Sequence, residues 1–109
     1  VVGINSDSSV RRLGKAPDRP IHSDFNRARL ISALSVVDAT IIFDSDTPLS
    51  IITSLSPDVL VKGGDYDPLC INRDHPTYIV GSTETRAAGG TIHSVPLLPG
   101  HSTTKILNK

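Results

Sequence analysis

The chain has 109 residues, enough for one domain, and its 11 basic and 11 acidic side chains give a formal net charge of zero. This neutral balance excludes the positive field of a nucleic-acid-binding protein, and no apolar run approaches the roughly 20 residues of a membrane span. The single cysteine, Cys70, excludes an internal disulfide and a cysteine-based metal cluster, which fits a reducing compartment such as the cytoplasm.

The first half of the chain alternates short apolar runs with helical stretches. In chain order we predict a strand at 1–4, a short helix opened by the polar cluster 5–9 and ending at 13, a loop at 14–21, a helix over 24–37 and a strand at 39–43. Leu30, Leu34 and Val37 recur at helical spacing, with Ile31 and Ala33 beside them. We therefore expect this stripe to form the buried face of the second helix.

The second half continues the alternation. In chain order we predict a helix after Pro48 that stops at Pro57, a strand at 59–61, a long polar surface loop at 67–81, a helix at 83–88, a strand at 92–96 and a terminal helix after the turn at 99–104. The strands are continuous apolar runs, as in a parallel sheet covered on both faces. The pattern predicts one α/β domain over 1–109, a Rossmann-like three-layer sandwich with a parallel sheet.

The turns after two strands carry residues suited to a phosphate ligand. Ligands of open α/β sheets bind beyond the carboxyl ends of the strands. After the third strand, Lys62-Gly63-Gly64-Asp65 offers a cation, close backbone approach and an acceptor for ribose hydroxyls, although a glycine turn with solvated charges explains the same residues. Residues 100–104 place hydroxyls and backbone N–H groups at a helix start, which suits a phosphate or is a simple Ser/Thr cap.

Basic residues gather at the end of the first predicted helix and in the loop after it. They are Arg11, Arg12, Lys15 and Arg19, with Arg27 on the next helix. Arginine pairs phosphate oxygens in a fork, so these side chains could clamp a phosphate. A solvated basic loop balanced by nearby aspartates is the simpler interpretation of the cluster taken alone.

The acidic and histidine residues give no pattern of a metal site. Asp44 and Asp46 precede Pro48, so we interpret them as helix-capping residues. The four histidines are scattered without the spacing of metal ligands, and we expect no metal site built from protein side chains. The glycine motifs of P-loop and dinucleotide-binding proteins are absent from the sequence.

Four runs of the sequence resemble the cytidylyltransferase-like nucleotidyltransferases. The runs are Val2-Gly3-Ile4-Asn5-Ser6-Asp7-Ser8-Ser9-Val10, Arg19-Pro20-Ile21, Asp58 to Tyr66 and Gly100-His101-Ser102-Thr103-Thr104-Lys105-Ile106. The nearest branch is similar to the D-glycero-β-D-manno-heptose 1-phosphate adenylyltransferases. In many bacteria these form the C-terminal half of a bifunctional protein whose N-terminal half is a sugar kinase.

The resemblance implies transfer of AMP from ATP, with Mg²⁺, to a sugar 1-phosphate and release of pyrophosphate in ADP-heptose synthesis. It implies that Lys62 and Arg27 face phosphate groups as the catalytic cations. The nucleotide-binding residues that it implies are Gly63, Asp65, Ser102, Thr103 and Thr104. The residues that it implies on the side of the acceptor sugar phosphate are Asn5, Asp7, Lys15 and Arg19. A kinase domain upstream and a homo-oligomer are the partners to expect.

One departure from the family limits what the chain is expected to do. The family's His-x-Gly-His motif lies on its first βα unit, and no His-x-Gly-His occurs in this sequence. We therefore expect an N-terminal truncation that lacks this unit, and a chain that is a weak enzyme or none on its own. The alternatives are a cytidylyltransferase for glycerol phosphate or phosphoethanolamine, and a non-catalytic nucleotide-binding module.

Overall fold

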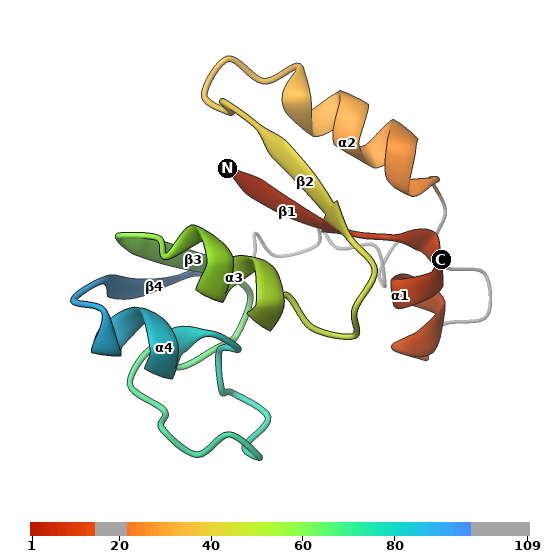
Figure 1. The fold of residues 1–109 in the computed structure, drawn as a ribbon. Helices are drawn as coiled ribbons and strands as arrows, with labels where there is room; N and C mark the ends of the chain where they lie inside the picture. The colour runs from red at the N-terminus through yellow and green to blue at the C-terminus, as the bar shows by residue number, and fades with distance from the viewer. Residues whose placement is uncertain (15–21, 97–109) are drawn as a thin grey trace. The chain divides into compact units, whose positions relative to one another are not determined.

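The computed structural model describes residues 1–14 and 22–96, and the chain divides into two compact units, residues 1–51 and 52–109. Figure 1 shows the helices and strands of both. The elements of the first unit are β1 (Val2–Asn5), α1 (Asp7–Arg12), α2 (Asp24–Ser32) and β2 (Thr40–Phe43). The elements that follow are α3 (Leu49–Leu55), which spans the boundary between the units, then β3 (Val59–Gly63), α4 (Ser82–Ala87) and β4 (Thr91–Val95).

In the first unit, β1 and β2 form a parallel pair that runs in register from Val2 opposite Thr40 to Asn5 opposite Phe43. Helix α2 packs against both strands and lies along β2, while α1 begins where β1 ends (Figure 1). Ile4 and Phe43 are buried. Both lie toward the carboxyl ends of their strands, so the core of this unit supports the edge at which the polar turns begin.

Helix α2 presents a different face to the strands from the one predicted. Leu30 and Leu34 are 63% and 52% exposed, so the expected buried stripe is wrong at these two positions, whereas Ile31 and Val37 are half-buried. The better shielded residues are Asp24, Arg27, Ala28 and Ile31, which recur at the spacing of one helix face. The helix is also shorter than predicted, because it ends at Ser32 and residues 33–37 form turns. Two charged side chains of α2, those of Asp24 and Arg27, are therefore partly shielded.

In the second unit, β3 and β4 form another parallel pair, from Val59 opposite Thr91 to Gly63 opposite Val95. Helix α4 packs against both strands. Strand β4 alternates strictly between exposed and half-buried residues, as expected for a sheet covered on one face only. Val59 and Val61 lie on the open face and are 53% and 57% exposed.

The segment 67–81 is only partly the surface loop that its polarity predicted. Tyr78 and Ile79 near its end are 7% and 2% exposed, and the Tyr78 hydroxyl lies 2.8 Å from Thr83 Oγ1. Arg73 donates to Glu84 Oε1 at 2.8 Å, which joins the middle of the segment to α4. The segment is thus anchored to the helix that follows it.

The predicted α/β class with parallel strands is confirmed. Each unit has the strand–helix–strand order of a Rossmann-like fold and pairs its strands in parallel. The predicted elements were correct in type in the part of the chain that the structure describes, with shifts at several ends. The predicted terminal helix lies outside the described residues.

Candidate functional site

The carboxyl end of β1 is tied to the loop that follows β2. Ser6 caps α1 by accepting from the Ser9 backbone N–H at 3.1 Å, and its hydroxyl donates to Asp44 Oδ1 at 2.6 Å. The buried Ser9 hydroxyl donates to the Ser45 carbonyl at 2.7 Å and accepts from Asn5 Nδ2 at 3.1 Å. These bonds fix the orientation of the Asn5 side chain, one of the predicted acceptor-side residues, at the end of its strand.

The starts of α1 and α2 are joined by two aspartates. Asp24 Oδ2 accepts from the Asp7 backbone N–H at 3.0 Å, and Asp7 Oδ1 accepts from the Asp24 backbone N–H at 2.8 Å. Each carboxylate thus satisfies a free N–H group in the first turn of the other helix, where the helix dipole favours negative charge. The pair holds two helix starts together although they lie 17 positions apart in the sequence.

Arg27 is held against this pair. Its Nη2 donates to Asp7 Oδ1 at 3.2 Å and its Nε to the His22 carbonyl at 3.1 Å, with about a quarter of each charged side chain exposed. Asp7 Oδ1 therefore serves both Arg27 and the α2 backbone, and its visible role is to position these groups. The guanidinium lies at the edge where the sequence predicts phosphate.

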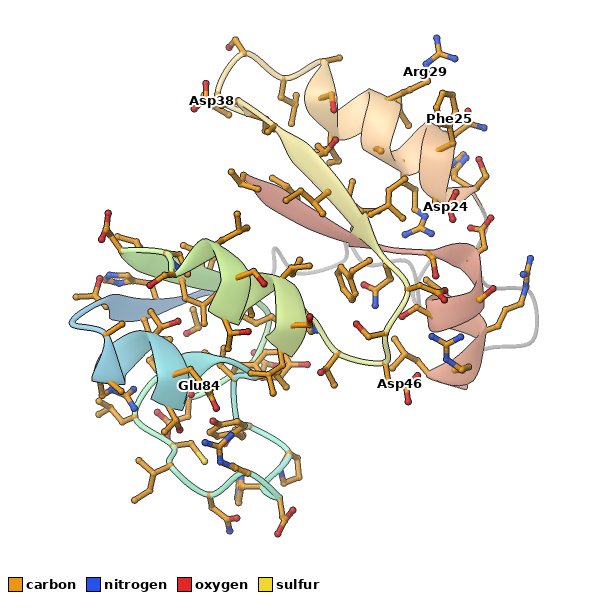
Figure 2. The ribbon with its side chains drawn as sticks, viewed as in Figure 1. Asp24, Phe25, Arg29, Asp38, Asp46 and Glu84 are labelled. Atoms are coloured by element: carbon orange, nitrogen blue, oxygen red, sulfur yellow. The ribbon has the colours of Figure 1, made fainter. Side chains whose placement is uncertain are left out.

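Arg12 contacts the loop after β2. Its Nε donates to Asp46 Oδ1 at 2.6 Å, and its Nη2 donates to the Asp44 carbonyl. The side chains of the two aspartates contact Ser6 and Arg12, and their capping role for α3 stays a prediction. Figure 2 labels Asp46 in this loop and Asp24 at the start of α2. The ion pair is exposed, and such pairs contribute little to stability.

The turn predicted to bind nucleotide lies at the carboxyl end of β3. Gly64 is buried, has φ of 115° and donates its N–H to the Val95 carbonyl at 2.8 Å. This positive φ is a conformation that favours glycine. The bond ties the turn to the end of β4, while Lys62, Gly63 and Asp65 are exposed around it. The turn therefore offers a cation, open backbone and a carboxylate at one strand end.

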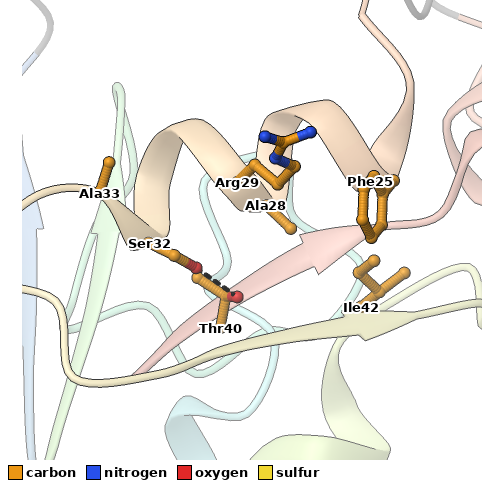
Figure 3. A pocket seen from close by; sticks show the side chains of 7 residues that line it. All are labelled: Phe25, Ala28, Arg29, Ser32, Ala33, Thr40 and Ile42. Carbon is orange, nitrogen blue, oxygen red and sulfur yellow. Dashed lines mark hydrogen bonds between the residues drawn. The ribbon is translucent and has the colours of Figure 1, made fainter.

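A groove of the first unit lies elsewhere, between α2 and β2. Figure 3 shows its lining of Phe25, Ala28, Arg29, Ser32, Ala33, Thr40 and Ile42. Ser32 and Thr40 bridge its floor through a hydroxyl pair 2.9 Å apart. The groove contains none of the predicted site residues, and its apolar floor offers little to a phosphate.

Curated relatives match the chain over nearly its whole length. The bifunctional protein HldE of Hyphomonas neptunium is 56% identical over 107 residues, which are 98% of this chain and 20% of the relative. The HldE protein of Syntrophotalea carbinolica is 44% identical over 109 residues, which are 100% of this chain and 20% of the relative. That of Rhodopseudomonas palustris is 47% identical over 107 residues, 98% of this chain and 20% of the relative. The chain is thus similar to one part of the HldE proteins.

This similarity confirms the predicted resemblance to bifunctional proteins of this kind. The chain spans about a fifth of the length of the HldE relatives that it matches. No family model matches the chain. Among residues 1–14 and 22–96, the structure has no helix long and apolar enough to cross a membrane, and no group of three His, Cys, Asp or Glu side chains placed for a metal ion.

The structure groups the predicted site residues of this HldE relative by unit. Asn5, Asp7 and Arg27 come together at the end of β1, and Lys62, Gly63 and Asp65 share the turn after β3. Five further predicted residues lie outside the described part of the chain: Lys15, Arg19, Ser102, Thr103 and Thr104. Their predicted roles stay predictions.

Three residues of these groups were not predicted as site residues. Ser6 was noted only as following the first strand and, with Ser9, as part of a capping cluster, and Asp24 only as a countercharge to the basic loop. Their common signal is a serine cap followed by an acidic residue, which occurs at Ser6-Asp7 and again at Ser23-Asp24. Two helix starts of this kind at one edge of a sheet can accept hydrogen bonds from each other's free backbone N–H groups.

Proposed function

We propose that this chain forms part of an adenylyltransferase that transfers AMP from ATP to D-glycero-β-D-manno-heptose 1-phosphate and releases pyrophosphate. The observation that carries the proposal is the turn Lys62-Gly63-Gly64-Asp65, which lies at the carboxyl end of a parallel strand where α/β proteins bind nucleotides. Similarity to the HldE proteins supports it. The proposal places the chain in ADP-heptose synthesis, in the cytoplasm.

The proposed reaction is a single displacement at phosphorus. An oxygen of the sugar phosphate attacks the α-phosphorus of ATP, the bond from that phosphorus to the β-phosphate oxygen breaks, and pyrophosphate leaves with its Mg²⁺. No covalent enzyme intermediate forms, so the protein contributes by positioning the substrates and by stabilising charge on the phosphate oxygens. Mg²⁺ enters with ATP as part of the substrate.

The residues after β3 suit the nucleotide. The exposed Lys62 ammonium supplies a positive charge for phosphate oxygens, and Asp65 supplies an acceptor for ribose hydroxyls. An added Cβ at Gly63 would meet no atom within 4 Å, so the space beside its backbone is open. We assign Ser102, Thr103 and Thr104 to the phosphates on the resemblance alone.

The residues at the end of β1 suit the acceptor. Arg27 is oriented by Asp7 and the His22 carbonyl, bonds that use its Nε and Nη2 and leave Nη1 to face a phosphate. Asn5 is fixed by Ser9 and offers its amide carbonyl to a sugar hydroxyl. In this proposal Lys15 and Arg19 approach the same acceptor. A kinase activity elsewhere in the parent protein would supply a second function, and a homo-oligomer is compatible with this site.

Calorimetric titration of the chain with ATP and with CTP tests the nucleotide site. We expect ATP to bind more tightly, and Lys62→Ala to weaken ATP binding about 10-fold, the effect of losing one charge-assisted hydrogen bond. Arg29→Ala is the matched control, because it removes an exposed cation that lines the groove beside β2. Tighter binding of CTP would contradict the adenylyl assignment, and binding of neither nucleotide would contradict the site itself.

A second experiment tests the transfer step. The chain is joined to a βα unit that carries His-x-Gly-His, and pyrophosphate release is measured with ATP and heptose 1-phosphate. We expect release that depends on both substrates and falls in the Lys62→Ala variant. A joined protein that binds ATP but releases no pyrophosphate would favour the non-catalytic nucleotide-binding module.

A further inference from the structure

The Lys62 side chain is held in place by an aromatic ring. Its ammonium nitrogen lies 5.1 Å from the centroid of the Tyr66 ring, within the range of a cation–π contact. A lysine at a strand end otherwise samples many rotamers of its four-carbon stem, and ordering it on ligand binding costs free energy. The ring therefore reduces the freedom that Lys62 would lose on meeting a ligand.

The backbone of the same turn fixes the Tyr66 ring. An added Cβ at Gly64 would lie 3.3 Å from Tyr66 Cε2 and 3.4 Å from Cδ2, so the ring packs closely against the glycine. Gly64 in turn donates to the Val95 carbonyl at the end of β4. The ring thus packs on a turn that follows β3 and is hydrogen-bonded to the end of β4. Tyr66 is half-buried, whereas Lys62 is exposed.

The contact leaves the charge of Lys62 available. Arg12 and Arg27 face carboxylates, which neutralise part of their charge. A tyrosine ring is neutral, and its quadrupole attracts the ammonium without supplying a counter-ion. The ammonium has three N–H donors, and not every one of them needs to point at the ring. Those that do not can donate to phosphate oxygens.

We propose that Tyr66 is a positioning residue for nucleotide binding: its ring holds the Lys62 ammonium at the end of β3, directed to the phosphates of ATP. This rests on the proposed function of the turn. Tyr66 itself contacts no substrate in the proposal, and its effect passes through Lys62. The ring, not the hydroxyl, carries the role, because the contact that the structure shows is with the ring.

Two substitutions in the full chain separate the ring from the rest of the residue. Tyr66→Leu removes the cation–π contact and Tyr66→Phe keeps it. We expect Tyr66→Leu to weaken ATP binding about 2- to 5-fold, the effect of an exposed cation–π contact, and Tyr66→Phe to bind as the unsubstituted chain does. Adenosine, which has no phosphates, should bind equally to all three proteins. A substitution that merely disturbs the turn would weaken adenosine as well.

A double-mutant cycle with Lys62→Ala completes the test. In the Lys62→Ala background, Tyr66→Leu should have no further effect on ATP binding, because its effect passes through the missing ammonium. The Lys62 Hε protons should show an upfield ring-current shift in the NMR spectrum that Tyr66→Phe keeps and Tyr66→Leu abolishes.

The outcomes distinguish this inference from the proposed function. If the unsubstituted chain binds ATP and Tyr66→Leu binds it equally well, the positioning role is overturned while the nucleotide site stands. Equal losses for ATP and adenosine, or additive effects in the cycle, overturn it in the same way. If the unsubstituted chain binds no ATP, the proposed function and the positioning role both fail.

Discussion

Glu84 makes the stability of the second unit sensitive to acid. Its carboxylate accepts from Arg73 at 2.8 Å, and this hydrogen bond lowers the pKa of Glu84 below its ordinary value of 4.5. The folded state therefore binds the proton less tightly than the unfolded state. The stabilisation is fully present above pH 4.5 and is lost as the pH falls through the lowered pKa. We expect the free energy of unfolding, measured with urea, to fall between pH 5 and pH 3.

Two variants show whether Glu84 causes part of that fall. Glu84→Gln removes the titrating group and Arg73→Gln removes its partner, so each should flatten the dependence of stability on pH across this range. The slope is the informative quantity, since either variant also changes stability at neutral pH. Variants whose slopes match that of the unsubstituted chain would show that this pair does not control the acid response.

The side chains of the candidate site could be found from the sequence only where their partners are local. Lys62 was located because it directly follows a predicted apolar strand and the carboxyl ends of parallel strands carry ligand sites, whereas the resemblance implied Asn5 and Asp7. The bond from Asp24 to the Asp7 backbone joins residues 17 positions apart. It depends on how two helices enter the unit, which no local pattern encodes.

Helix α2 illustrates the same limit for a whole element. The alternation of strands and helices follows from apolar runs, capping residues and prolines, all of which are local. Which face of α2 meets the strands was predicted wrongly, because Leu30 and Leu34 are more apolar than Ala28 and Arg27. The contacts of Asp24 and Arg27 with the start of α1 orient the helix instead. Polar bonds can therefore override the apolar stripe of a short helix.

The glycines on either side of α4 offer a matched test of packing at the element scale. Gly81 and Gly89 have φ of 90° and 88°, so an alanine at either position takes the same backbone strain, about 1–2 kcal/mol. An added Cβ at Gly81 would lie 2.7 Å from Ile52 Cδ1, whereas an added Cβ at Gly89 would meet no atom within 4 Å. We expect Gly81→Ala to cost about 1–3 kcal/mol more than Gly89→Ala, from overpacking against Ile52.

Urea denaturation of the two variants under one condition measures this difference. Because the backbone strain is common to both, subtraction isolates the contact between residue 81 and Ile52. The double variant Gly81→Ala with Ile52→Val shortens the side chain that carries Cδ1, and should recover part of the loss. Equal losses for the two single variants would show that Ile52 moves aside at little cost.

At the scale of the whole molecule, a small core and a balanced charge together affect solubility. Five apolar side chains are buried in the described residues: Ile4, Phe43, Ile52, Tyr78 and Ile79. Each unit pairs only two strands there, and two-stranded sheets are marginally stable without further packing. The 11 basic and 11 acidic side chains cancel, so no net repulsion keeps molecules apart near the sequence pI of 7.1. Exposed apolar surface therefore has its greatest effect on solubility near neutral pH.

The open face of the β3–β4 pair allows a direct test of that effect. Val59 and Val61 lie on this face of β3. Thr91 is the registered partner of Val59 in β4, so its side chain lies on the same face. Val61→Thr exchanges a methyl group for a hydroxyl and Thr91→Val makes the reverse exchange, so neither changes the net charge. We expect Val61→Thr to raise solubility in ammonium sulfate at pH 7 and to lower the fluorescence of a bound apolar dye, and Thr91→Val to do the opposite. Changes of the same sign in both variants would show that the apolar character of this face does not limit solubility.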